Sequence, residues 1–218
     1  SRVNTFLHVN HRPGAQPRYG TLMCVNGTGI LNRWLHETLA TDRSYERMNE
    51  EAAAAPVGAD GLTVLPFGNG AERTLGNLDL GASVHDLNFN VHDRSHLLRA
   101  AQEGIVFALR HGLDIMRDMG LSIDTVRAGH ANMFLSPVFR TAFATVTETA
   151  VELLQTDGAE GAARGAGIGA DLYDSPEEAF ESLEPIDTIR PQSDQAAPYE
   201  AAYQRWSRTL NHQRTRKQ

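Results

Sequence analysis

Several features that would narrow the function are scarce in this sequence. It contains one cysteine, Cys24, which excludes an internal disulfide framework and a cysteine-based zinc site. No stretch approaches the roughly 18 apolar residues that a membrane-spanning helix needs, and residues 1–8 lack the apolar core of a secretory signal. The formal net charge of −7 would repel nucleic acid and anionic membrane surfaces. These absences predict a cytoplasmic protein with no nucleic-acid or membrane partner.

The residues that are present suit a folded α/β domain. The chain has 218 residues, 41% of them hydrophobic, which is enough for one large domain or two small ones. Strand-like segments alternate with segments of helical periodicity, as is typical of α/β proteins. The expected strands are Asn4–Val9, Thr21–Val25, Leu62–Pro66, Ala82–Val84, Thr125–Ala128 and Ala150–Leu154, and the expected helices are a run around Trp34, Ser44–Ala55, Arg94–Met119, Pro137–Thr147, Glu160–Tyr173 and Tyr199–Leu210.

Two of these helices carry clear boundary signals. Asp93 suits the N-cap of the helix at Arg94–Met119, and Gly120 suits its end. Ser136 and Pro137 suit the N-cap and first position of the next helix. The longer helix also carries one apolar stripe at three- and four-residue steps, formed by Leu98, Ala101, Ile105, Leu109, Gly112 and Met116.

Two strand-turn-helix units contain glycine turns, Asn26–Gly29 and Gly129–Asn132. A helix N-terminus with exposed amides can hold a phosphate, so these turns indicate a nucleotide site, although glycine turns occur in most α/β domains. The dinucleotide fingerprint of a Rossmann oxidoreductase would need glycine at position 32, which is Asn32. A Walker A pattern is also absent. An NAD-dependent oxidoreductase is therefore disfavoured.

Other groups capable of chemistry have no diagnostic partner. His92 and His96 have the spacing of paired metal ligands on a helix, but His92 precedes the expected helix start, so a structural role is favoured over metal binding. His130 is expected to be exposed in its turn. The carboxylates Asp60 and Asp157 lie alone in the sequence, so spacing designates neither as a catalytic base.

Three segments, read in order, resemble the FGGY carbohydrate kinase family, and most closely its xylulokinase-like branch. The first is Leu65–Thr74, which is similar to the family's stretch ending in Gly-Glu-Arg-Thr. The second is Ala82–Glu103, which resembles the C-terminal signature except that Asp86 replaces a glycine and Gln102 replaces an apolar residue. The third is Ala128–Phe139 with Thr156–Ala163, which is similar to the adenosine motif and its backing helix, with one glycine where relatives have two or three.

The resemblance implies an actin-like ATPase fold of the ribonuclease H type, with ATP in a cleft between two similar halves. This chain looks like the C-terminal half of a two-domain sugar kinase. Residue by residue, Gly29 and Arg33 match positions that line the nucleotide, with Arg33 in place of a glutamine. Gly129 and Asn132 match the adenosine loop. The implied cofactors are ATP and Mg²⁺, and the implied substrate is a sugar of the pentulose class.

The same resemblance assigns the catalytic aspartate, the first phosphate loop and most sugar contacts to the N-terminal half. It therefore implies no catalytic residue in this chain and magnesium ligands mainly from that half, which would be a partner. Without that half, a strand edge and an apolar interdomain face would be exposed, and these would favour association, including a homodimer. The alternative is a noncatalytic nucleotide-binding or interaction module of the same fold. The expected organisation is a nucleotide-binding domain at 1–184, a polar linker at 185–198, and a terminal helix with a basic tail at 199–218.

Overall fold

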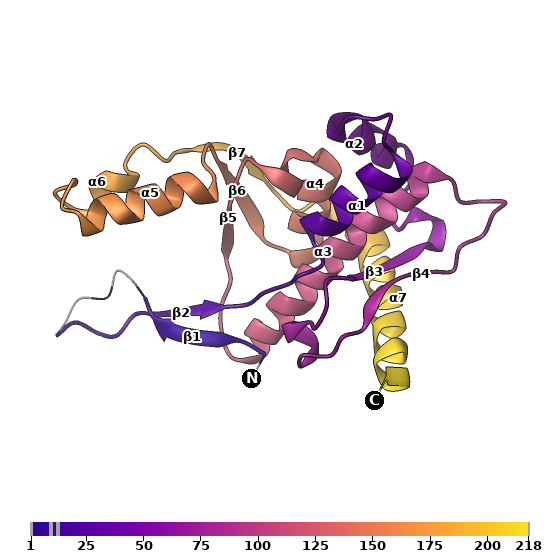
Figure 1. The fold of residues 1–218 in the computed structure, drawn as a ribbon, viewed down its shortest axis with the longest axis horizontal. Helices are drawn as coiled ribbons and strands as arrows, with labels where there is room; N and C mark the ends of the chain where they lie inside the picture. The colour runs from indigo at the N-terminus through magenta and orange to yellow at the C-terminus, as the bar shows by residue number, and fades with distance from the viewer. Residues whose placement is uncertain (1, 9–10, 12–13, 218) are drawn as a thin grey trace.

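The computed structural model describes residues 2–8, 11 and 14–217 of the chain and has an α/β architecture (Figure 1). Its helices are α1 (Gly29–Leu39), α2 (Tyr45–Ala54), α3 (Arg94–Asp118), α4 (Pro137–Thr147), α5 (Gly158–Gly169), α6 (Pro176–Phe180) and α7 (Ser193–Lys217). Its strands are β1 (Asn4–Leu7), β2 (Tyr19–Leu22), β3 (Thr63–Phe67), β4 (Gly81–His85), β5 (Thr125–Gly129), β6 (Ala150–Leu154) and β7 (Pro185–Ile189).

Helix α3 is the central element of the molecule. Its start is confirmed as predicted, because the Asp93 carboxylate accepts hydrogen bonds from the amides of Ser95 and His96 at 2.9 and 3.3 Å. Every residue from Leu98 to Ala108 is buried, which is more than one stripe of the helix. The reason is that α2, α4, α7 and β3 all pack around it (Figure 1). The predicted stripe is therefore one part of a helix whose middle section, Leu98–Ala108, is enclosed on all sides.

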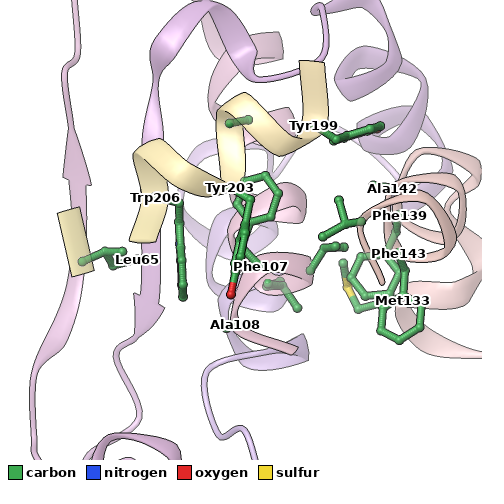
Figure 2. Close-up of a cluster of buried hydrophobic side chains, with 14 of the residues drawn as sticks. Leu65, Phe107, Ala108, Met133, Phe139, Ala142, Phe143, Tyr199, Tyr203 and Trp206 are labelled. Atoms are coloured by element: carbon green, nitrogen blue, oxygen red, sulfur yellow. The ribbon is translucent and has the colours of Figure 1, made fainter. Parts of the chain in front are cut away.

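Aromatic side chains from three helices form the main core (Figure 2). Trp206 and Tyr203 of α7 project toward Phe107 of α3. The rings of Phe139 and Phe143, both from α4, lie on the opposite side of Phe107. The ring centroids of Phe107 and Trp206 are 6.1 Å apart. The Trp206 indole N–H donates to the Val64 carbonyl oxygen of β3 at 3.0 Å, which satisfies the one polar group of this buried side chain. The core thus fixes α7 against α3 and β3.

The strands form three separate sheets among the described residues. β1 pairs with β2 and β3 with β4, both antiparallel, while β5 runs parallel to β6 and β6 antiparallel to β7. The second strand is therefore Tyr19–Leu22 rather than Thr21–Val25, because its register is set by pairing with β1. The expected end of the first strand at Val9 lies outside the described residues.

The prediction of a polar linker at 185–198 is wrong at the level of secondary structure. Residues Pro185–Ile189 form β7 at the edge of the β5-β6-β7 sheet, and α7 begins at Ser193. The side chains of β7 are mostly exposed, so their polar character resembles that of a linker although their backbone is paired with β6. Pro198 lies inside α7, where it removes one helical hydrogen bond without ending the helix.

Within the described ranges, no helix combines the length and the apolar character needed to cross a bilayer.

Candidate functional site

Two adjoining cavities lie beside the N-terminus of α1. The first, of about 960 Å³, lies between α1, α2 and the segment from His130 to Val138. The second, of about 910 Å³, lies between the residues that follow β2, the middle of α3, β5 and the start of α5. Gly29, Asn132 and Met133 line both cavities, so we treat them as one cleft.

The loops after the parallel strands β5 and β6 meet at one end of this cleft. A Cβ atom on Gly129 would lie 2.4 Å from the Thr156 carbonyl oxygen, which is closer than any real contact, so the two loops can touch only because residue 129 is glycine. The amide of His130 donates to the Leu154 carbonyl oxygen at 2.8 Å and ties the loops together. Asn132 follows with φ of 51°, a left-handed conformation that asparagine tolerates.

The N-terminus of α1 is open toward the cleft. Its N-cap, Thr28, makes no side-chain hydrogen bond to the helix, and the first turn contains no acidic residue. Backbone N–H groups in such a position attract anions, through hydrogen bonding and through the helix dipole. The site is therefore suited to a phosphate group.

A buried carboxylate holds the turn that leads into α1. Glu72 is 1% exposed and accepts hydrogen bonds from the amides of Asn26 and Thr74 at 2.9 and 3.3 Å. A Cβ on Gly27 would lie 1.6 Å from the Pro66 carbonyl oxygen, so this turn packs directly on the backbone at the end of β3. The segment Leu65–Thr74 therefore supports the position of α1, and Glu72 has no access to a substrate.

Arg33 supplies the positive charge of the first cavity. It is the only arginine or lysine among the described residues that line it, and it lies one turn after Gly29. Its Nε is 3.8 Å from a Glu37 carboxylate oxygen, with both side chains more than half exposed, so the guanidinium remains accessible. Glu46 and Glu50 of α2 line the same cavity, and because Glu50 is ion-paired with Arg47 at 2.5 Å, Glu46 is the carboxylate that makes the α2 side acidic.

The structure brings together the residues that the sequence predicted to bind nucleotide. Gly29, Arg33 and Asn132 line the first cavity, while Gly129 joins Gly29 and Asn132 at the second. Their role in nucleotide binding stays a prediction. Sequence reasoning missed the opposite wall, formed by Tyr45 and other residues of α2, because α2 reads as an acidic surface helix and no motif marks it.

Metal binding was disfavoured for the histidines, and the structure gives His96 another role. Its Nδ1 lies 2.8 Å from an Asp93 carboxylate oxygen and its Nε2 lies 3.2 Å from one of Asp60. These contacts form part of the N-terminal cap of α3. Asp157 is likewise an N-cap, since it accepts from the Glu160 amide at 2.9 Å. In the described part of the chain, no three His, Cys, Asp or Glu side chains are grouped so as to hold a metal ion.

The cap at His96 predicts a pH-dependent contribution to stability. The Asp93 carboxylate, with help from Asp60, raises the pKa of His96, so the folded state favours the protonated ring. This contribution is complete below the unfolded pKa of about 6.5 and is lost as the pH rises through the higher folded pKa. We expect the Tm of the wild type to fall by about 2 °C more than the Tm of His96→Gln when the pH is raised from 6 to 9, as measured by thermal unfolding. A constant difference between the two proteins would contradict this role.

A match to a family model establishes the family to which this chain belongs. The model of the "FGGY family of carbohydrate kinases, C-terminal domain" matches residues 3–170. The chain belongs to the FGGY family of carbohydrate kinases. It is 34% identical over 194 residues to a xylulose kinase of Haemophilus influenzae, covering 85% of this chain and 38% of that protein. It is 30% identical over 172 residues to an L-xylulose/3-keto-L-gulonate kinase of Escherichia coli, covering 77% and 33%.

Solved FGGY structures agree with the fold. A xylulose kinase from Rhodospirillum rubrum superposes with a TM-score of 0.78 at 26% identity, covering 97% of this chain and 42% of that one. A Plasmodium falciparum glycerol kinase with ADP gives a TM-score of 0.77 at 20% identity, again with coverage of 97% and 42%. The fold is thus that of the C-terminal half of FGGY sugar kinases, of the actin-like ATPase type. The chain spans about two fifths of the length of these kinases.

The structure accommodates both departures from the FGGY signature. Asp86, which replaces a glycine, has φ of 62°, the conformation that explains the family glycine and that aspartate can also adopt. Gln102, which replaces an apolar residue, is 3% exposed but is fully engaged: its amide N–H donates to Asn49 and its carbonyl oxygen accepts from Ser136. Neither departure disturbs the cleft.

Proposed function

We propose that this chain is the nucleotide-binding half of an ATP-dependent sugar kinase that transfers the γ-phosphate to a hydroxyl of a pentulose such as xylulose. One observation carries the proposal. Gly29, Arg33, Gly129 and Asn132, which the family resemblance assigns to nucleotide binding, come from segments about 100 residues apart and line one cleft. Membership of the FGGY family and the xylulose kinases among its relatives support the reaction and the sugar class.

The cleft has features that suit each part of ATP. The open N-terminus of α1 offers backbone amides to phosphate oxygens, and Arg33 adds a positive charge next to them. Exposed apolar surface on Leu135, together with Val138 and Met133, offers a wall for a planar base. The glycerol kinase structure of the same fold, which was solved with ADP, is consistent with a nucleotide in this architecture.

The remaining chemistry is assigned to the other half of the kinase. When bound, Mg²⁺ would neutralise charge on the transferring phosphoryl group. The residues of this chain would bind and orient the nucleotide, which brings its reactive end to a fixed place. The aspartate base, most magnesium ligands and the sugar contacts would come from the N-terminal half. We therefore expect the chain alone to bind nucleotide without appreciable phosphoryl transfer.

The Arg33→Ala variant tests the proposed function. Removing the arginine of the first cavity should weaken Mg·ATP binding about fivefold, because a hydrogen bond to a charged group is worth roughly 1.5–3 kcal/mol and part of this is lost to solvent. Calorimetric titration measures the effect, with Arg208→Ala as the matched control, since Arg208 is an exposed arginine of α7 outside the cleft. Equal affinity for Mg·ATP in all three proteins would remove Arg33 from the site.

A further inference from the structure

Three buried or half-buried polar side chains form a relay behind the first cavity. The Ser136 hydroxyl donates to the side-chain oxygen Oε1 of Gln102 at 2.7 Å, and the side-chain Nε2 of Gln102 donates to Oδ1 of Asn49 at 3.0 Å. Ser136 and Gln102 are 1% and 3% exposed, whereas Asn49 is half-buried. The relay runs from the N-cap of α4 through the middle of α3 to α2.

The direction of this relay determines which end of the Asn49 amide is free. The Ser136 oxygen accepts from the Phe139 amide at 3.3 Å, and its hydroxyl proton is donated to Gln102, which orients the Gln102 side chain. With Gln102 in this orientation, turning the Asn49 side chain over would place its NH₂ group against the NH₂ group of Gln102, and the two donors would leave each other unsatisfied. The Oδ1 atom of Asn49 is therefore held by Gln102. The Nδ2 atom has no hydrogen-bond partner among the described residues, and Asn49 lines the first cavity together with Ser136. A fixed donor thus faces a cavity that holds the proposed nucleotide residues.

The charges around the cavity indicate which part of a nucleotide lies on this side. Glu46 lines the cavity beside Asn49 on α2, and its carboxylate would repel phosphates, whereas the charge of Glu50 is balanced by an ion pair with Arg47 at 2.5 Å. The open N-terminus of α1 and Arg33 would attract phosphates to the other side. The neutral base is therefore the part that suits the α2 side. A purine presents ring nitrogens that accept hydrogen bonds and so complement an amide donor.

We propose that the Nδ2 group of Asn49 donates a hydrogen bond to a ring nitrogen of the purine base, and that Gln102 is the positioning residue that orients it. This inference rests on the proposed function and adds a residue that sets specificity for the base. It also gives a purpose to the one polar replacement in the buried part of the FGGY signature. An apolar side chain at position 102 would leave the Asn49 amide free to rotate, and its donor would be less well oriented.

The experiment combines protein variants with single-atom changes in the ligand. Calorimetric titrations of the wild type with Mg·ATP and with its 1-deaza, 3-deaza and 7-deaza analogues identify the nitrogen, because each analogue replaces one acceptor by C–H. We expect one analogue to bind about threefold to tenfold more weakly than Mg·ATP, the effect of one hydrogen bond. Asn49→Ala should lose the same factor for Mg·ATP and nothing further for that analogue.

Two other variants separate orientation from general damage. Gln102→Leu should weaken Mg·ATP binding and reduce the discrimination between Mg·ATP and the selected analogue, which a merely structural role would not do. Asn211→Ala, at an exposed asparagine of α7 outside the cleft, should bind all ligands as the wild type does. Circular dichroism melts check that each variant is folded.

The outcomes distinguish the two levels of the argument. Wild-type protein that is folded and binds no Mg·ATP would overturn the proposed function together with this inference. If the wild type binds Mg·ATP, two results would overturn the role of Asn49 alone. One is an Asn49→Ala variant that binds Mg·ATP as tightly as the wild type does. The other is an Asn49→Ala variant that loses the same factor in affinity for Mg·ATP and for all three analogues.

Discussion

Replacing Arg99 with methionine should lower the free energy of unfolding by about 3 to 5 kcal/mol, the usual cost of leaving one member of a buried ion pair without its partner. Arg99 and Glu103 lie one turn apart on α3, with side chains only 8% and 2% exposed. The Arg99 Nε donates to a Glu103 carboxylate oxygen at 2.7 Å. Without Arg99, the Glu103 carboxylate would remain buried without its ion-pair partner.

The surroundings of this pair make the loss large. Arg99 also donates to the Tyr199 hydroxyl oxygen at 2.8 Å and to the Ala55 carbonyl oxygen at 3.3 Å. The Glu103 carboxylate accepts from the Gly58 amide, with both oxygens at 3.1 Å from the nitrogen. The pair therefore links α3 to α7 and to the segment after α2. The Arg99→Met change removes the hydrogen bonds to Tyr199 and Ala55 together with the ion pair.

Urea denaturation measures the effect, and the chain offers a matched control. Arg33 and Glu37 have the same four-residue spacing on α1 but are 62% and 64% exposed, so Arg33→Met should change the free energy of unfolding by less than about 1 kcal/mol. The double variant Arg99→Met/Glu103→Leu should recover much of the loss, because no charge then remains buried. A change below about 1 kcal/mol in Arg99→Met would contradict the structural role of the pair.

Gly129→Val should reduce Mg·ATP affinity by more than tenfold and also lower stability by about 2 kcal/mol, within the range for a strained or overpacked site. The added Cβ would lie 2.4 Å from the Thr156 carbonyl oxygen and 3.3 Å from its carbonyl carbon. The loops after β5 and β6 must separate to accept it. The position of Asn132 would change with them, because it lies three residues further along the same loop.

A second glycine provides the control for this variant. Gly165 lies on α5 outside the cleft, and a Cβ there would meet nothing within 4 Å, so Gly165→Ala should leave Mg·ATP affinity unchanged and stabilise the helix by about 0.5 to 1 kcal/mol. Circular dichroism establishes that each variant is folded before the calorimetric titration. If Gly129→Val does not fold, Gly129→Ala carries the same clash with a smaller side chain. Unchanged affinity in a folded Gly129 variant would contradict the assignment of this loop.

The elements that the sequence predicted well are those with strong local signals. The helix expected at Arg94–Met119 is Arg94–Asp118 in the structure: Asp93 caps its start, and the chain leaves the helix at Gly120, whose φ is 86°. The helix at Pro137–Thr147 and the strand at Ala150–Leu154 have the predicted bounds. Caps, proline positions and short apolar runs act over a few residues, so one sequence is sufficient to recognise them.

The elements that were missed depend on distant partners. β7 is a strand because β6 pairs with it, and its exposed side chains carry no alternating pattern. The helix expected at Glu160–Tyr173 ends at Gly169, and the Leu172 amide turns back to the Gly167 carbonyl oxygen at 2.9 Å. The family resemblance supplied four residues of the site. It did not supply Asn49, because that residue reaches the cleft only through the packing of α2 on α3.

The measurement that tests the central claim most directly is calorimetric titration of the folded chain with Mg·ATP and, separately, with NAD. A nucleotide-binding half of an FGGY sugar kinase is predicted to bind Mg·ATP selectively, with no heat of binding for NAD. Binding of NAD with equal or higher affinity, or no binding of Mg·ATP at millimolar concentration by a chain shown to be folded, would contradict the account.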